Sequence, residues 1–161
     1  MRAFAEDARP WLRRSRGGYD AIMVDAYRQP YIPFYLATRE FFELTRERLA
    51  PGGVVVVNVG HPEGSDELER VLGRTMAAAF PHVLRYPIEP TNTLLLAGEG
   101  PLSAARLRRS AGSLTQPLRP LALAAAAALS PRLAGGEVYT DDRAPVEWLV
   151  DSSLLEYANG Q

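Results

Sequence analysis

The stretch Tyr19-Asp20-Ala21-Ile22-Met23-Val24-Asp25 is an apolar run that ends in a carboxylate. Its core is apolar at consecutive positions, as is typical of parallel strands that helices cover on both faces, and it predicts a short buried strand. A second run, 54–59, is almost pure valine, whose branched side chain favours the pleated sheet. The two runs together predict the strands of a buried sheet.

Helices are predicted between and after these strands, at 38–49 and 65–80. Thr38 serves as N-cap of the first helix, and Pro51-Gly52-Gly53 ends it. Two further runs, 82–88 and 91–97, predict strands close enough to form a hairpin. The order strand, helix, strand, helix, strand, strand indicates an α/β fold with right-handed crossovers and an antiparallel last strand.

The chain changes character after residue 97. Short helices are predicted at 103–110 and 118–129, then a short strand at 137–140, a polar turn at 141–148 and a fraying tail at 154–161. The sequence thus predicts one partial domain, with the sheet and its helices in 1–97 and a helical and turn extension in 98–161.

Composition limits the classes of protein. The chain has 161 residues, a net charge of -1 and no cysteine, which excludes disulfides and thiolate chemistry and fits a cytoplasmic protein. The charge does not indicate binding to nucleic acid or to an anionic membrane. No run approaches the ~20 apolar residues of a membrane span. The two histidines are far apart, so no metal site is predicted.

Three acidic positions are candidates for a functional site. Asp25 ends the first strand, and ligands of open α/β sheets bind outside the carboxyl ends of strands. The alternative is that Asp25 only caps a loop. Asp7 could follow an earlier strand or cap a helix, and both can hold at once because a capping carboxylate also presents itself to a ligand. The pair Asp141-Asp142 lies in a turn, where acids are usually solvated or capping. No glycine-rich phosphate loop, hydrolase elbow or His-x-x-x-His motif is present.

Taken together, several stretches resemble the spermidine synthase family, and most closely its bacterial spermidine synthase-like group, some of which are fused to transporter domains. The stretches that carry the resemblance are Asp7 to Leu12, Tyr19 to Ala26, Ile32 to Phe42, Leu49 to Val54 and Thr140 to Glu147. The resemblance implies an incomplete class I methyltransferase-like, or Rossmann-like, sheet, of which this chain supplies the fourth to seventh strands.

The resemblance also implies an activity, aminopropyl transfer from decarboxylated S-adenosylmethionine, or an S-adenosylmethionine-type co-substrate, to an amine. By resemblance, Asp7 and Ala8 hold the adenine of the donor and Asp25 acts as base. Tyr27, Asp141 and Asp142 are assigned to substrate binding, and no metal takes part. Two other functions stay open, a non-catalytic interaction module and a methyltransferase on the same sheet.

The sequence departs from the family in two places. Arg28 stands where polyamine aminopropyltransferases carry a second aspartate, and a cation there would repel a diamine, which predicts another acceptor or no catalysis. The glycine-rich loop and the first three strands are not in this sequence. We therefore expect a fragment, a misplaced start, or a subunit whose open strand edge pairs with a second copy or another chain.

Overall fold

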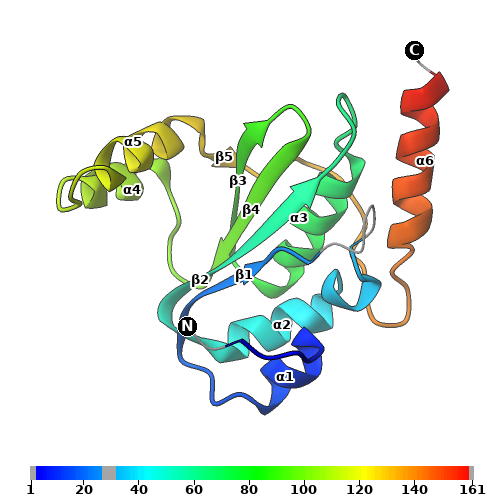
Figure 1. The fold of residues 1–161 in the computed structure, drawn as a ribbon, viewed down its shortest axis with the longest axis horizontal. Helices are drawn as coiled ribbons and strands as arrows, with labels where there is room; N and C mark the ends of the chain where they lie inside the picture. Colours follow the sequence, from blue (N-terminus) through cyan, green and yellow to red (C-terminus); the bar gives the residue numbers. More distant parts are fainter. Residues whose placement is uncertain (1–2, 27–31, 160–161) are drawn as a thin grey trace.

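The computed structural model describes residues 3–26 and 32–159, which form a five-stranded sheet with helices around it (Figure 1). The strand order is β1-β2-β4-β3-β5. The strands are β1 (Tyr19–Val24), β2 (Leu49–Gly60), β3 (His82–Glu89), β4 (Asn92–Gly98) and β5 (Ser130–Pro131). β1 is parallel to β2, whereas β4 is antiparallel to both of its neighbours. The predicted parallel strands and closing hairpin are confirmed.

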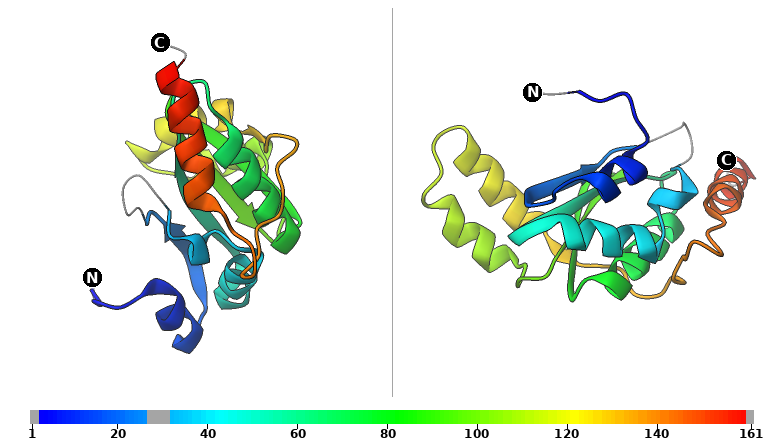
Figure 2. Two further views of the ribbon diagram at one scale, coloured as in Figure 1. Left: turned by 90° about the vertical axis from the view of Figure 1, so that its right-hand side faces the viewer. Right: turned by 90° about the horizontal axis from the view of Figure 1, so that it is seen from below.

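Side-chain alternation along β2 gives the sheet two different faces. Val55, Val57 and Val59 are at most 2% exposed and form one face with Leu95 of β4. Helices α2 (Arg39–Arg48) and α3 (Glu67–Ala79) cover this face (Figure 2). The hydroxyl of Thr38 caps α2 by accepting a hydrogen bond from the amide of Phe41, as the sequence predicts.

Two short helices flank β1 in the sequence, one before it and one after it. Helix α1 (Ala8–Arg14) packs on α2, and the guanidinium of Arg48 donates hydrogen bonds to the carbonyls of Leu12 and Arg13. The 3₁₀ helix η1 (Phe34–Leu36) precedes α2. Since α1 ends beside the start of β2, its N-terminus points toward the end of the sheet where β1 and β2 finish.

The opposite face of the sheet is only partly covered. A hairpin of α4 (Ala104–Ala111) and α5 (Leu118–Ala128) stands over Leu84 and Leu96 at the β3 side. At the other side β1 is the edge strand of the described sheet, and its Met23 is 74% exposed. β1 therefore has an unpaired edge within the described sheet, and Met23 projects from the sheet face opposite α2 and α3.

Two sequence expectations for the C-terminal extension are wrong. Residues 137–140 form no strand, because their backbone pairs with helices instead: the Tyr139 amide donates to Thr75 Oγ1, and its carbonyl accepts from the Arg39 amide. The supposed tail belongs to helix α6 (Val146–Asn159), which stands beside α3. The apolar spacing of Val146, Leu149 and Val150 buries one side of this helix.

Candidate functional site

A cleft of about 920 Å³ opens between the carboxyl ends of β1 and β2 and helix α6. Ligands of open α/β sheets bind outside the carboxyl ends of the strands, where the loops that follow the strands surround them. The described residues that line it are Asp25, Asn58, Gly60, His61, Pro62, Glu63, Thr91, Val150, Leu154 and Tyr157.

Asp25 and Asn58 meet because of the strand register. Val24 of β1 pairs with Val57 of β2, so the next residue of each strand lies at the same level of the sheet. Asn58 Nδ2 donates a hydrogen bond of 2.9 Å to Asp25 Oδ1. An amide carries no charge, so this contact orients the exposed carboxylate and leaves its negative charge available to a ligand.

His61 follows β2 directly and is held at both its backbone and its ring. Its amide donates to the carbonyl of Thr91 at 3.0 Å. Its Nδ1 lies 3.0 Å from the carbonyl oxygen of Pro62. Because a carbonyl oxygen only accepts, this contact assigns a proton to Nδ1. Nε2 is buried and has no hydrogen-bond partner within residues 3–26 and 32–159.

The charge and polarity of the lining suit a cation with a hydrocarbon part. Of the described lining residues, Asp25 and Glu63 are carboxylates and none is an arginine. Helix α6 forms the facing wall with Val150, Leu154 and the ring of Tyr157. A carboxylate attracts a cation, and apolar and aromatic side chains receive methylene groups.

Asp7 caps helix α1, with Oδ1 accepting a hydrogen bond of 2.9 Å from the amide of Arg9. Asp7 and Ala8 are exposed. Arg9 Nη1 reaches the carbonyl of Tyr35 in η1, the helix that follows the loop after β1. Asp7 therefore lies at the same end of the sheet as Asp25, although it does not line the cleft.

Asp141 lies outside the cleft lining and is neutralised by Arg9. The guanidinium donates two hydrogen bonds to its carboxylate, at 2.9 and 2.6 Å, and Thr38 Oγ1 donates a third at 2.7 Å. The hydrogen bonds from Arg9, aided by Thr38, lower the pKa of Asp141. Asp142 is exposed in the turn that the Thr140–Arg143 bridge closes. The structure thus does not bring these two acids together with Asp25.

Tyr27, predicted to bind substrate, and Arg28, predicted to repel a diamine, both lie outside the described residues. Sequence reasoning missed Asn58 and the α6 wall, and dismissed His61. Asn58 could have been found, since it is the one polar residue in the valine run of β2. The α6 wall could have been found from the helical spacing of Val146, Leu149 and Val150.

No cluster of three or more histidine and acidic side chains that could hold a metal ion occurs in the described residues. In the same ranges, no helix has the length and apolarity required to cross a bilayer.

Comparison with known proteins gives relatives of one kind. The chain is 45% identical over 75 residues to the "Probable polyamine aminopropyl transferase" of Bifidobacterium longum, covering 46% of this chain and 17% of that protein. It is 31% identical over 126 residues to the polyamine aminopropyltransferase of Vibrio vulnificus, covering 76% of this chain and 42% of the relative. A scan against family models found no match.

Solved structures share the fold. The crystal structure described as "a probable spermidine synthase" from Corynebacterium glutamicum superposes with a TM-score of 0.54 at 23% identity, over 82% of this chain and 53% of that one. A spermidine synthase in complex with the transition state analogue AdoDATO gives a TM-score of 0.54 at 17% identity, over 74% and 45% of the two chains.

The fold and the cleft at its strand ends define a Rossmann-like α/β protein that shares the fold of part of the solved spermidine synthase structures. The sequence relatives agree with this fold: the chain is similar to polyamine aminopropyltransferases over 46% and 76% of its length. It spans less than half the length of these curated relatives, at 17% and 42%.

Proposed function

We propose that the chain forms the amine side of an aminopropyltransferase site. A neutral amine in the cleft attacks the carbon next to the sulfonium of decarboxylated S-adenosylmethionine. The new bond joins nitrogen to carbon, the carbon–sulfur bond breaks, and methylthioadenosine leaves. Before the attack, the cationic amine gives a proton to Asp25, which leaves the neutral nitrogen that forms the new bond.

The single observation that carries this proposal is the charge of the cleft. Asp25 and Glu63 leave the described lining with an excess of negative charge, which attracts both a cationic amine and a sulfonium. Asp25 keeps its charge because its structural partner is the neutral amide of Asn58. The names of the curated relatives agree with this chemistry.

For the donor, we assign adenine binding to Asp7 and Ala8. Both are exposed at the end of the sheet where the cleft lies, and the Asp7 carboxylate retains acceptor capacity beyond its bond to the Arg9 amide. The transition state analogue bound by the solved spermidine synthase supports a donor of the S-adenosylmethionine kind. Tyr27 remains assigned to the amine, two residues after Asp25. We give Asp141 a structural role, and Asp142 is left as a solvated acid.

We also propose that the chain assembles through the edge of β1 and that it is located in the cytoplasm. The open edge of β1, with Met23 exposed, pairs with a second copy or with a chain that completes the sheet. The cysteine-free composition suits the cytoplasm. Sedimentation tests the assembly, and a monodisperse monomer of the isolated chain over a wide concentration range would contradict self-association.

Calorimetric titration of the chain with the diamine putrescine tests the function. We expect binding that Asp25→Asn weakens at least tenfold, while Asp142→Asn, the matched control outside the cleft, leaves it unchanged. Titration with methylthioadenosine and S-adenosylmethionine, repeated on Asp7→Ala, tests the donor side. Preference for S-adenosylmethionine would favour a methyltransferase, and no heat from a folded chain would favour the interaction module.

A further inference from the structure

Helix α5 presents an apolar face to solvent. Its buried side holds Ala126, and Arg108 of α4 donates a hydrogen bond of 3.1 Å to the Ala126 carbonyl, which ties the two helices of the hairpin together. The opposite side is uncharged, and Leu121 on it is 64% exposed. Its exposed members are Pro120, Leu121, Leu123, Ala124, Ala127 and Ala128, which we call the α5 face. Apolar side chains that gather on one exposed face, unlike single ones, mark an interaction site.

Positive charge surrounds the α5 face. Between Gly100 and Pro131 the chain has four arginines and no acidic residue. Arg119 lies in the first turn of α5, and Arg108 reaches a carbonyl near the other end, so a cation stands near each end of the helix. Because the segment supplies no carboxylate of its own, the α5 face fits an apolar partner that is bordered by negative charge.

Helix α6 carries an apolar pair on its outer side. Trp148 and Leu155 are 69% and 64% exposed, and they are seven residues, or two helical turns, apart, which places them on one side of the helix. Val146, Leu149 and Val150 bury the other side. Neither Trp148 nor Leu155 is among the described residues that line the cleft, so the pair, which we call the α6 outer face, is distinct from the candidate site.

Negative charge borders the α6 outer face. Glu147 precedes Trp148 and Glu156 follows Leu155, and both glutamates are exposed. Residues 144–161 contain three acids and no basic residue. The charge of this surface is therefore opposite to the charge around the α5 face.

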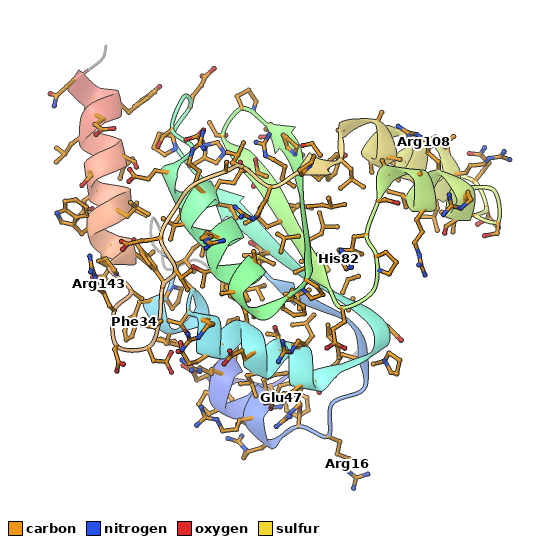
Figure 3. The ribbon with its side chains drawn as sticks, turned by 180° about the vertical axis from the view of Figure 1, so that it is seen from behind. Arg16, Phe34, Glu47, His82, Arg108 and Arg143 are labelled. Atoms are coloured by element: carbon orange, nitrogen blue, oxygen red, sulfur yellow. The ribbon has the colours of Figure 1, made fainter. Side chains whose placement is uncertain are left out.

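The two faces match in length but lie at opposite ends of the molecule. Trp148 and Leu155 are separated by about 10 Å along the helix axis, the same as Leu121 and Ala128 on α5. Figures 1 and 2 show the hairpin and α6 at opposite ends, and Figure 3 labels Arg108 at one end and Arg143, just before α6, at the other. One molecule cannot bring its own two faces together, whereas two copies can.

We propose that the α5 face of one copy packs against the α6 outer face of a second copy, so that the chain associates head to tail. In this contact Trp148 packs on the leucines and alanines of α5, and Glu147 and Glu156 face the arginines of the hairpin. Because the two faces are different surfaces, a dimer keeps one unused face of each kind, and association continues until a ring closes. The contact is separate from the β1 edge and does not depend on the proposed function.

Mixing of two variants tests the head-to-tail contact. Leu121→Glu disables the α5 face and keeps the α6 outer face, whereas Trp148→Glu does the reverse. A glutamate buried in this contact should weaken self-association about tenfold or more. Sedimentation velocity should therefore show smaller species for either variant than for the native chain, and a heterodimer for their equimolar mixture. Ile88→Glu, at an exposed apolar residue of β3, is the matched control and should behave as the native chain does. Pairing through the β1 edge is the same in all these chains, so it cannot produce a heterodimer that forms only on mixing.

Cross-linking tests the same contact without a disruptive substitution. The sequence has no cysteine, so single cysteines can be introduced one at a time. A chain with Ala124→Cys is mixed with an affinity-tagged chain with Leu155→Cys, and a flexible bis-maleimide links cysteines that lie close together. The mixed product should exceed each of the two homodimers several-fold, and added salt should lower its yield because salt screens exposed charges.

Three results would overturn the proposal: a native chain that stays monomeric at every concentration, a mixture that sediments like its components, or a mixed cross-link that does not exceed the homodimers. Binding of a monomeric native chain to phosphatidylglycerol vesicles, lost in Leu121→Glu, would assign the α5 face to an anionic membrane instead. Leu121 and Trp148 lie outside the described cleft lining, so both variants should bind putrescine as the native chain does, and the proposed function is tested separately.

Discussion

Asp25 and Asp141 are both exposed acids, but their hydrogen-bond partners in the structure differ. Asp141 receives two hydrogen bonds from the guanidinium of Arg9, which is only 12% exposed, and a third from Thr38. Asp25 receives one from the neutral amide of Asn58. The first carboxylate is paired with a guanidinium, whereas within the described residues the second has only a neutral amide as its hydrogen-bond partner and lies beside a cleft. The comparison shows that the partners of an acid, rather than its presence in a motif, decide whether it serves stability or a ligand.

The largest effect should come from the segment that carries Asp141. Gly136 has φ +79° and passes so close to α3 that a Cβ would lie 2.5 Å from the Arg70 carbonyl oxygen. We expect Gly136→Ala to lower the free energy of unfolding by about 2–4 kcal/mol, through the clash and the strained backbone. Urea unfolding measures it.

Gly135→Ala is the matched control for this substitution. Gly135 has a similar φ of +85°, but a Cβ there would meet only a side-chain nitrogen of Arg70, at 4.0 Å. We expect a loss of about 1 kcal/mol, from backbone strain alone. Equal losses for the two alanine variants would show that the contact with α3 does not hold the segment.

Breaking the ion pair itself should have the next largest effect. Asp141→Ala leaves the buried hydroxyl of Thr38 without its acceptor and takes the carboxylate from Arg9, which within the described residues keeps only the Tyr35 carbonyl. We expect the free energy of unfolding to fall by about 1–3 kcal/mol. Asp142→Ala, on the next residue, should change it by less than about 0.5 kcal/mol. Similar effects of the two variants in urea unfolding would remove the distinction drawn between Asp141 and a solvated acid.

The pH dependence of the free energy of unfolding should show the contribution of the same ion pair. Arg9 holds the pKa of Asp141 below the ordinary value of 3.8, so the carboxylate stabilises the fold above that pH and loses this effect as the pH falls below it. The native chain should therefore be more stable than Asp141→Asn at about pH 6, and the difference should shrink toward about pH 3. Asp66, whose pKa Arg70 also lowers, contributes equally to both chains and cancels. A pH-independent difference would argue against the ion pair.

The smallest effect concerns the partner of Asp25. Asn58→Leu removes the hydrogen bond that orients the carboxylate and should weaken putrescine binding about two- to fivefold, with little change in stability. If the amide acts through Asp25, Asn58→Leu should have no further effect on a chain that already carries Asp25→Asn. Additive effects in calorimetric titration would mean that Asn58 contacts the ligand independently.

The sequence predicted the sheet because its strands are continuous apolar runs, 54–59 above all, and because proline and glycine mark their ends. The C-terminal extension was predicted less well. Residues 137–140 have the composition of a strand, yet their backbone bonds to Thr75 and Arg39, partners that only the tertiary structure supplies. Helix α6 was missed because its apolar residues are not confined to the face of Val146, Leu149 and Val150: Trp148 and Leu155 are exposed, which weakens the helical pattern.

The candidate site, like the fold, could be predicted where it depends on local sequence and not where it depends on tertiary contacts. Asp25 could be predicted, since the end of a parallel strand is a local property of the sequence. The place of His61 in the cleft could not, because it depends on the register of β2 with β4 and on a helix that lies 85 or more residues further along the chain. Asp141 was assigned to substrate because the sequence does not show that Arg9, 132 positions away, reaches it.

The central claim is that the cleft, and not the region of Asp141, binds a cationic amine. The most direct measurement is a backbone amide NMR titration of the chain with putrescine and with butanediol, a diol of the same length without charge. We predict shifts at Asp25, Asn58 and His61 and along the inner side of α6 for putrescine, and none for the diol. Shifts that centre on Arg9, Asp141 and Asp142, or that are the same for both compounds, would contradict the account.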